Sequence, residues 1–359
     1  MHMHAPRKLR SFLCSVCVLM AVAVASPAHA AHLEFVTEVD GTITDVTPQR
    51  ILFFTMDDWR PILKVYNRAT GSLRVVPDPN GHTPGYEQLT SRGIMFGTTE
   101  DDETSLYEWT GAATPLLHDG TPRGMRVSPN SRRYVIWPTW RPGEGRYLIL
   151  RDVLLSRNTL VGNGRVADLA DVGDQGEVVY TDGPTPYNVF RFRAGQTVQL
   201  THDATYSNFN PLTDGVNVVY RKQVSATASR IVLYNDSLGE VVLRDSSTTN
   251  YFTPRADYFP ASGWVAFTRI NTVDDAAVRQ VWLRSPQGQL SAVSPAGDDA
   301  SIVAVAAGQV MYSSRGYLYL GRPGAAPVLV SPFAEGAGTA WLQGAWYVHF
   351  GGGLYRVVL

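Results

Sequence analysis

A three-residue pattern, in which a β-branched residue is followed by any residue and then an aromatic one, recurs along this chain. It occupies residues 51–53, 94–96, 135–137, 178–180, 218–220, 265–267, 310–312 and 348–350. The aromatic positions lie 38 to 47 residues apart, and short β-rich segments with intervening turns fill each interval. A period near forty residues with almost no helical periodicity is typical of a four-stranded propeller blade. The sequence therefore predicts an all-β fold, an eight-bladed β-propeller of four-stranded blades.

Each unit continues with a second β-rich segment, and most of these segments end in a turn that carries glycine, as at Thr70-Gly71 and Ala194-Gly195. Glycine suits such hairpins because it adopts positive φ without steric cost. A ring of seven blades remains an alternative, but it would require one of the eight units to be spurious.

The eighth unit has room for only three strands, at residues 339–342, 346–350 and 354–358. A spare β-rich segment, residues 33–39, precedes the first unit, which starts near Gly41. We expect this N-terminal strand to complete the last blade, because such closure leaves no free sheet edge.

Residues 1–30 have the order of a secretory signal peptide: basic residues Arg7, Lys8 and Arg10, an apolar run, and an Ala-His-Ala end. A membrane anchor is the alternative, but the apolar core of about 14 residues is shorter than the roughly 20 needed to span a bilayer. Cys14 and Cys17, the only cysteines, fall in this segment. We therefore expect a periplasmic or secreted protein in which residues 31–359 form a single propeller domain without disulfides, a monomer with no membrane span.

Removal of residues 1–30 would leave 28 Lys and Arg against 32 Asp and Glu, a net charge near −4. Nucleic-acid partners select for a clustered basic surface, which this composition does not indicate. We therefore expect no nucleic-acid partner.

Two turns that precede triplets have a distinctive sequence, and the turn before the third triplet is the clearer of them. Val127-Ser128-Pro129-Asn130-Ser131 precedes the triplet at 135–137, and Asn210-Pro211 with Asp214-Gly215 precedes the triplet at 218–220. This resembles the S-P-D-G turn of TolB-like propeller blades, with Asn-Ser in place of Asp-Gly. Proline presets φ and Asp, Asn or Gly accepts the turn dihedrals, so the motif is structural.

The TolB-like resemblance covers residues 31–359 as a repeat, although most units lack the Ser-Pro. TolB itself carries an additional N-terminal α/β domain, for which the residues before Gly41 leave no room. The G-x-S-x-G elbow of propeller serine peptidases is also absent from the sequence.

Metal ligation is not indicated by the histidines. His118-Asp119 and His202-Asp203 each follow the last strand of a unit, so the repeat explains them better as turn residues than as ligands. No H-E-x-x-H, C-x-x-C or calcium-loop spacing occurs. The sequence therefore predicts no metal site and no cofactor.

The loops between the second and third strands of each unit lie on one face of a propeller, and they differ most from unit to unit. Their distinctive content is Trp, Arg and acid, including residues 100–103 and Asp274-Asp275. The candidate ligand-binding residues among them are Asp57, Asp58, Trp59, Arg60, Trp140, Arg141, Arg221 and Arg269. Rigid scaffolds often carry ligand-binding residues in loops that vary from repeat to repeat. The alternative is that these loops are solvated turns with no binding role.

Two hypotheses of function follow. The first is an exported, non-enzymatic propeller that binds a protein or cell-envelope partner. The second is a polysaccharide lyase or glycoside hydrolase acting on an acidic glycan, since tryptophan faces stack on sugars and arginines bind uronate carboxylates. The apolar residues 302–307 predict close packing at the ring axis, which argues somewhat against a catalytic funnel there. Catalytic residues are not identified.

Overall fold

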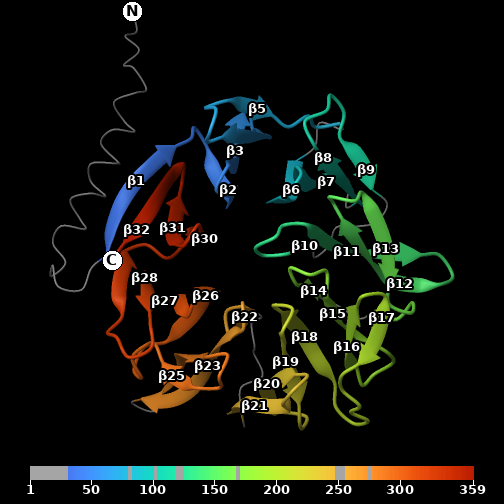
Figure 1. The fold of residues 1–359 in the computed structure, drawn as a ribbon, viewed down its shortest axis with the longest axis vertical. Coiled ribbons are helices and arrows are strands. Elements are labelled where there is room, and N and C mark those ends of the chain that lie inside the picture. Colours follow the sequence, from blue (N-terminus) through green and yellow to red (C-terminus); the bar gives the residue numbers. More distant parts are fainter. Residues whose placement is uncertain are drawn as a thin grey trace, which may run out of the picture.

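The computed structural model describes residues 31–79, 83–100, 103–118, 125–166, 170–246, 255–273 and 276–359. Eight four-stranded antiparallel sheets stand in a ring, and every regular element in these residues is a β-strand (Figure 1). The prediction of an eight-bladed propeller is confirmed. Residues 1–30, with Cys14 and Cys17, lie outside the described part, so the signal peptide stays a prediction.

The strands of each blade run from the ring axis outward in chain order, except in blade eight, whose outer strand is β1. The innermost strands are β2 (Thr42–Val46), β6 (Thr83–Leu89), β10 (Arg126–Val127), β14 (Asp171–Val172), β18 (Asn208–Thr213), β22 (Tyr258–Ala261), β26 (Ala300–Ala306) and β30 (Gly338–Leu342). The second strands are β3 (Arg50–Asp57), β7 (Ile94–Glu100), β11 (Tyr134–Arg141), β15 (Val178–Asp182), β19 (Asn217–Gln223), β23 (Trp264–Val273), β27 (Gln309–Ser314) and β31 (Ala345–Phe350).

The outer half of each blade is built in the same way. The third strands are β4 (Arg60–Asn67), β8 (Glu103–Trp109), β12 (Gly145–Asp152), β16 (Asn188–Arg193), β20 (Ser229–Asn235), β24 (Ala276–Arg284), β28 (Tyr317–Gly321) and β32 (Gly353–Val358). The outer strands are β5 (Leu73–Val75), β9 (Leu116–His118), β13 (Arg157–Val161), β17 (Gln196–Gln199), β21 (Gly239–Ser246), β25 (Leu290–Ala292), β29 (Val328–Ser331) and β1 (His32–Glu38). In the residues described, no helix is long and apolar enough to cross a membrane.

Strand β1 completes blade eight, as the sequence predicted. It pairs antiparallel with β32, from His32 opposite Val358 to Glu38 opposite Gly353, with one bulge. The preceding residue, Ala31, is buried and donates its backbone N–H to Leu329 O at 2.9 Å. The ring is therefore closed by hydrogen bonds between the first and last described strands.

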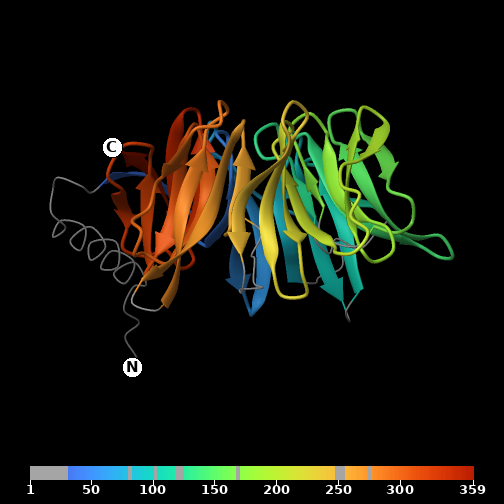
Figure 2. The same ribbon diagram turned by 90° about the horizontal axis from the view of Figure 1, so that it is seen from below.

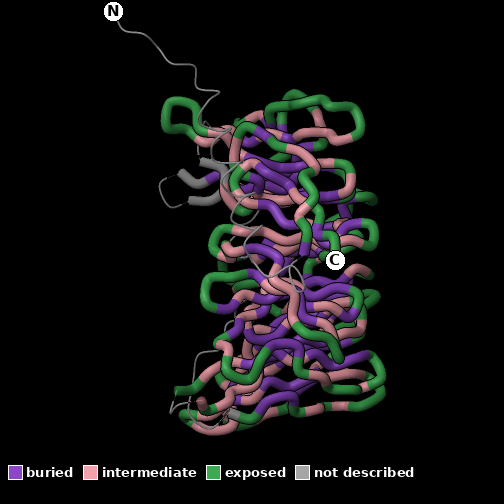
Figure 3. Tube along the Cα trace, turned by 90° about the vertical axis from the view of Figure 1, so that its left-hand side faces the viewer, coloured by how far each residue is buried: buried purple, intermediate pink, exposed green. Residues whose placement is uncertain are grey.

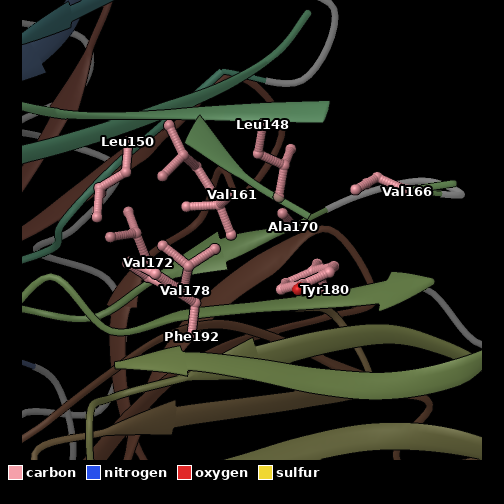
Figure 4. Close-up of a cluster of buried hydrophobic side chains, with 10 residues drawn as sticks. Leu148, Leu150, Val161, Val166, Ala170, Val172, Val178, Tyr180 and Phe192 are labelled. Carbon is pink, nitrogen blue, oxygen red and sulfur yellow. The ribbon is translucent and has the colours of Figure 1, made fainter. Parts of the chain in front are cut away.

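The repeated triplets build the core between blades. All three residues of each triplet are buried in the first seven blades, and neighbouring sheets pack against each other through them. Figure 4 shows one such layer, in which Leu148, Leu150 and Val161 of blade three meet Val178 and Tyr180 of blade four. Buried residues fill the interior of the disc and exposed ones gather at its turns (Figure 3).

The eighth triplet was placed two residues out of register. Each of the first seven triplets begins at the first or second residue of its strand, whereas Val348 is the fourth residue of β31. The matching position is filled by Trp346, and both Trp346 and Val348 are buried. Blade eight therefore reverses the pattern, because its aromatic residue comes first.

The antiparallel strands divide the connections between two faces of the disc (Figure 2). We call the hairpin face the one that carries the turns between second and third strands, such as residues 57–60 and 141–145, and the connections between blades. We call the turn face the one that carries the other turns, such as residues 128–133. There Ser128 accepts a hydrogen bond from Tyr134 N at 3.1 Å, as expected for a structural Ser-Pro turn.

Candidate functional site

The most exposed aromatic residue on the hairpin face is Trp59, in the two-residue turn between β3 and β4. Asp57 pairs with Arg60, and the two turn residues Asp58 and Trp59 have φ values of 43° and 67°. Left-handed φ at both positions is the pattern of a type I′ turn, which usually selects Asn-Gly or Asp-Gly. A tryptophan there costs about 1–2 kcal/mol of backbone strain. The residue is nonetheless 91% exposed, so it gains almost nothing from packing in the isolated chain.

Trp140 and Arg141 end β11 in blade three. Trp140 lies opposite Arg146 of β12 and is 65% exposed. Arg141 Nη1 lies 3.5 Å from Glu144 Oε2, and its guanidinium is 5.6 Å from the ring centroid of Tyr147. This hairpin therefore exposes the side chain of Trp140 next to the guanidinium group of Arg141.

Arg221 and Arg269 are held against aromatic rings of their own blades. Arg221 lies 4.6 Å from the ring centroid of Phe209, and Arg269 lies 4.4 Å from that of Trp282 and 5.4 Å from that of Phe267. Asp57 to Arg60 form the hairpin end of blade one, and Trp140 and Arg141 lie at the hairpin end of blade three. Arg221 and Arg269 were expected in loops, but they lie within the paired strands β19 and β23, opposite Ile231 and Gln280.

Several residues named from the sequence lie outside the described part of the chain. These are Asp101, Asp102, Asp119, Asp274 and Asp275.

His118 was expected in the turn after the outer strand of blade two, but it is the last residue of that strand, β9, and is buried. Its Nε2 lies 3.2 Å from Glu108 Oε2, and Arg151 Nη2 of the next blade lies 2.5 Å from the same oxygen. All three side chains are buried. Burial alone would raise the pKa of Glu108, but the hydrogen bond from His118 and the charge of Arg151 lower it. Among the residues that the structure describes, no group of three or more His, Cys, Asp or Glu could hold a metal ion.

A second charged cluster, which the sequence did not predict, lies at the seam of blades four and five and joins Lys222, near the hairpin-face end of β19, to Glu240, at the turn-face end of β21. Lys222 Nζ lies 3.2 Å from Asp203 Oδ2 and 2.9 Å from Glu240 Oε2. Tyr220 donates its hydroxyl to Glu240 Oε1 at 2.6 Å. Burial alone would lower the pKa of Lys222, but these carboxylates raise it. The result is a pair of partly exposed carboxylates bridged by one ammonium group.

Residues near the ring axis correct the expectation of simple apolar packing there. Arg132 of blade three donates to Asp45 of blade one, with Nη2 to Oδ1 at 2.8 Å. Arg255, which precedes β22 of blade six, donates to Asp171 of blade four at 3.1 Å. Residues 302–307 are apolar as expected, but inner strands of other blades carry charge. These pairs join residues 84 and 87 positions apart, so no local motif announces them.

Each of these carboxylates also accepts a hydrogen bond from the backbone of the blade that lies between its own blade and that of its arginine. Asp45 Oδ2 accepts a hydrogen bond from Leu89 N of blade two at 2.8 Å, and Asp171 Oδ2 accepts one from Thr213 N of blade five at 3.0 Å. Asp45 and Asp171 therefore each link three consecutive blades.

Comparison with known proteins identifies a fold and no close relative. No family model and no curated protein matches the chain. The computationally designed Ika8 protein is 14% identical, with a TM-score of 0.51 over 92% of this chain and all of that one. A prolyl endopeptidase is 12% identical, with a TM-score of 0.51 over 96% of this chain and 60% of that one.

TolB from Acinetobacter baumannii is also among the similar structures, at 14% identity and a TM-score of 0.40 over 81% of this chain and 70% of that one. Likeness at this level shows the fold alone. What the comparisons and the structure show together is therefore an eight-bladed β-propeller.

Proposed function

We propose that this protein is an exported, non-enzymatic binding propeller, which recognises a protein or glycan of the cell envelope through its hairpin face. Trp59 and Trp140 are its anchoring residues. The predicted signal peptide at residues 1–30 supports export to the periplasm or the cell exterior.

The observation that carries this proposal is the state of Trp59. The residue is strained in its backbone and 91% exposed, so the isolated chain gains no stability from it. Strain of this kind is concentrated at ligand-contacting positions. A tryptophan held on a rigid hairpin offers a large apolar surface that loses little conformational freedom on binding, and Trp is enriched among binding hot spots.

The test is binding of the Trp59→Ala/Trp140→Ala double variant to immobilised cell-envelope extract and to acidic polysaccharides. Loss of an anchoring aromatic should weaken binding by about 1–3 kcal/mol, because a modest hot spot contributes that much. The melting temperature should not fall, since neither indole is buried. The Leu238→Ala variant is the matched control, because Leu238 is 54% exposed on the turn face. Full binding by the double variant would refute the proposal.

A catalytic role toward acidic glycans is the second candidate, and the cluster around Lys222 is what favours it. Paired carboxylates with a neighbouring tyrosine are the groups that glycan-cleaving enzymes use for acid and base catalysis. Under this hypothesis, the purified protein should release unsaturated or reducing ends from a polyuronate. The Glu240→Gln variant should abolish that release while Trp59→Ala affects only substrate binding. Absence of any release from a panel of polyuronates would eliminate this candidate.

A further inference from the structure

Two adjacent leucines are exposed on the turn face of blade three. Leu154 and Leu155 lie in the turn between β12 and β13, and they are 54% and 61% exposed. The preceding residue, Val153, is fully buried, so the leucines lie at the tip of a turn whose base is packed in the core. Apolar side chains exposed side by side are a mark of an interaction site, whereas single ones are common on any surface.

The backbone of this turn is held by the carboxylate of Asp152. Its Oδ1 accepts hydrogen bonds from Leu154 N and Leu155 N, both at 3.1 Å. Arg133 donates its Nε to both oxygens of the same carboxylate at 3.0 Å, and its carbonyl accepts from Val153 N at 3.0 Å. The leucine pair is therefore presented by a fixed backbone, which loses little conformational freedom when a partner binds.

Arginines flank the leucine pair. Arg92 of blade two donates its Nη1 to Val153 O at 3.4 Å and to Ser156 Oγ, so its guanidinium lies against this turn. Arg157 follows the turn as the first residue of β13 and is exposed. Together with Arg133, three arginines belong to the turn or donate to its residues and their neighbours.

The rest of the turn face shows that this concentration of positive charge is local. The six turns of this face in blades one to three, residues 47–49, 68–72, 90–93, 110–115, 128–133 and 153–156, contain four arginines and no Asp or Glu. The four turns of this face in blades four and five, residues 173–177, 194–195, 214–216 and 236–238, contain four acidic residues and no Lys or Arg. The arginines are Arg68, Arg92, Arg132 and Arg133, and the acidic residues are Asp174, Glu177, Asp214 and Asp236.

We call these two groups of turns the basic sector and the acidic sector of the turn face. Arg132 and Arg133 of the basic sector form ion pairs with strand residues, Asp45 and Asp152. Arg92 and Arg157 form no ion pair with the residues that the structure describes, so the leucine pair lies where positive charge is least compensated.

We infer that the leucine pair, with Arg92 and Arg157, docks on an anionic lipid bilayer. Protein segments that bind at a membrane interface combine apolar side chains, which enter the acyl boundary, with cations that meet anionic headgroups. Leu154 and Leu155 supply the first feature and the arginines of the same turn supply the second. Because the turn face lies opposite the hairpin face, docking in this orientation leaves the residues of the proposed partner-binding surface directed away from the bilayer.

The experiment is sedimentation of the purified protein with vesicles of phosphatidylcholine alone and with vesicles in which half of the lipid is phosphatidylglycerol. We expect binding to the anionic vesicles and little to the neutral ones, and we expect added sodium chloride to weaken it because salt screens the arginines. The Leu154→Ser/Leu155→Ser variant should bind the anionic vesicles roughly tenfold less tightly, since burial of each methylene group contributes to membrane affinity. Its melting temperature should not fall, because neither leucine is buried.

The other variants separate charge from apolar contact. Arg157→Gln should weaken binding to the anionic vesicles roughly fivefold and reduce its dependence on salt, because each arginine near an anionic surface adds to the attraction. Leu238→Ser is the matched control: Leu238 is 54% exposed on the same face, but it lies in the acidic sector beside Asp236, so this variant should bind like the wild type. The Trp59→Ala/Trp140→Ala variant should also bind vesicles normally, which keeps this test independent of the one for the hairpin face.

Three results would overturn the proposal: no binding to the anionic vesicles, equal binding to both kinds of vesicle, or full binding by the leucine double variant. If the wild-type protein ignores vesicles but binds a lipid-free envelope protein that the leucine double variant does not bind, the surface belongs to a protein partner and the lipid assignment is wrong.

Discussion

At the scale of single residues, the buried contact of Glu108 with His118 and Arg151 makes stability depend on pH. The pKa of Glu108 is lowered in the folded state, so its stabilising contribution is present above the unfolded pKa of about 4.3 and is lost as pH falls through the folded value. Glu108→Gln leaves Arg151 buried without a counter-charge, which should cost about 3–5 kcal/mol at pH 7. Urea unfolding of both proteins should show this gap shrinking below about pH 4, once the wild-type carboxylate protonates. The matched control is Glu144→Gln, whose partner Arg141 is solvent-exposed, and it should change stability by less than about 1 kcal/mol. A gap of constant size from pH 7 to pH 3 would contradict this account.

At the scale of strands, the fold was largely predictable because each blade repeats a local pattern of a buried triplet followed by turn residues. The triplets and glycine turns gave the blade boundaries, and residues 33–39 gave β1 within one residue. Blade eight shows the limit of such prediction. Its aromatic residue, Trp346, comes before the β-branched Val348, so a search for the triplet matches Val348 and Phe350 instead, two residues too late. Deletion of residues 32–38 should expose β32 as a free edge and lower stability by several kcal/mol, since each lost hydrogen bond and buried contact contributes about 1 kcal/mol. Differential scanning calorimetry measures this, and a synthetic peptide of residues 31–40 should restore part of the lost melting temperature. An unchanged melting temperature in the deletion variant would show that the closure contributes nothing.

At the scale of the whole molecule, the candidate sites were predictable only where they lie in single hairpins. Trp59 and Trp140 belong to loops that depart from the repeat, so sequence alone could place them on one face. The pairs Arg132–Asp45 and Arg255–Asp171 depend on the curvature of the ring, which brings blades two positions apart within reach of one side chain. The cluster of Lys222, Asp203 and Glu240 likewise unites an inter-blade connection with two strands. No residue spacing in the sequence predicts these contacts between blades.

The pairing of β1 with β32 also sets an order of events in biosynthesis. His32 finds its partner only when Val358 is available, so the strand made first is the last to acquire its hydrogen bonds. Contacts so distant in sequence form slowly, because the entropy of the intervening chain must be lost first. A ring closed in this way cannot be completed before residues 353–358 have been synthesised. Until then the last blade stays open, and the edge of β1 has no partner strand.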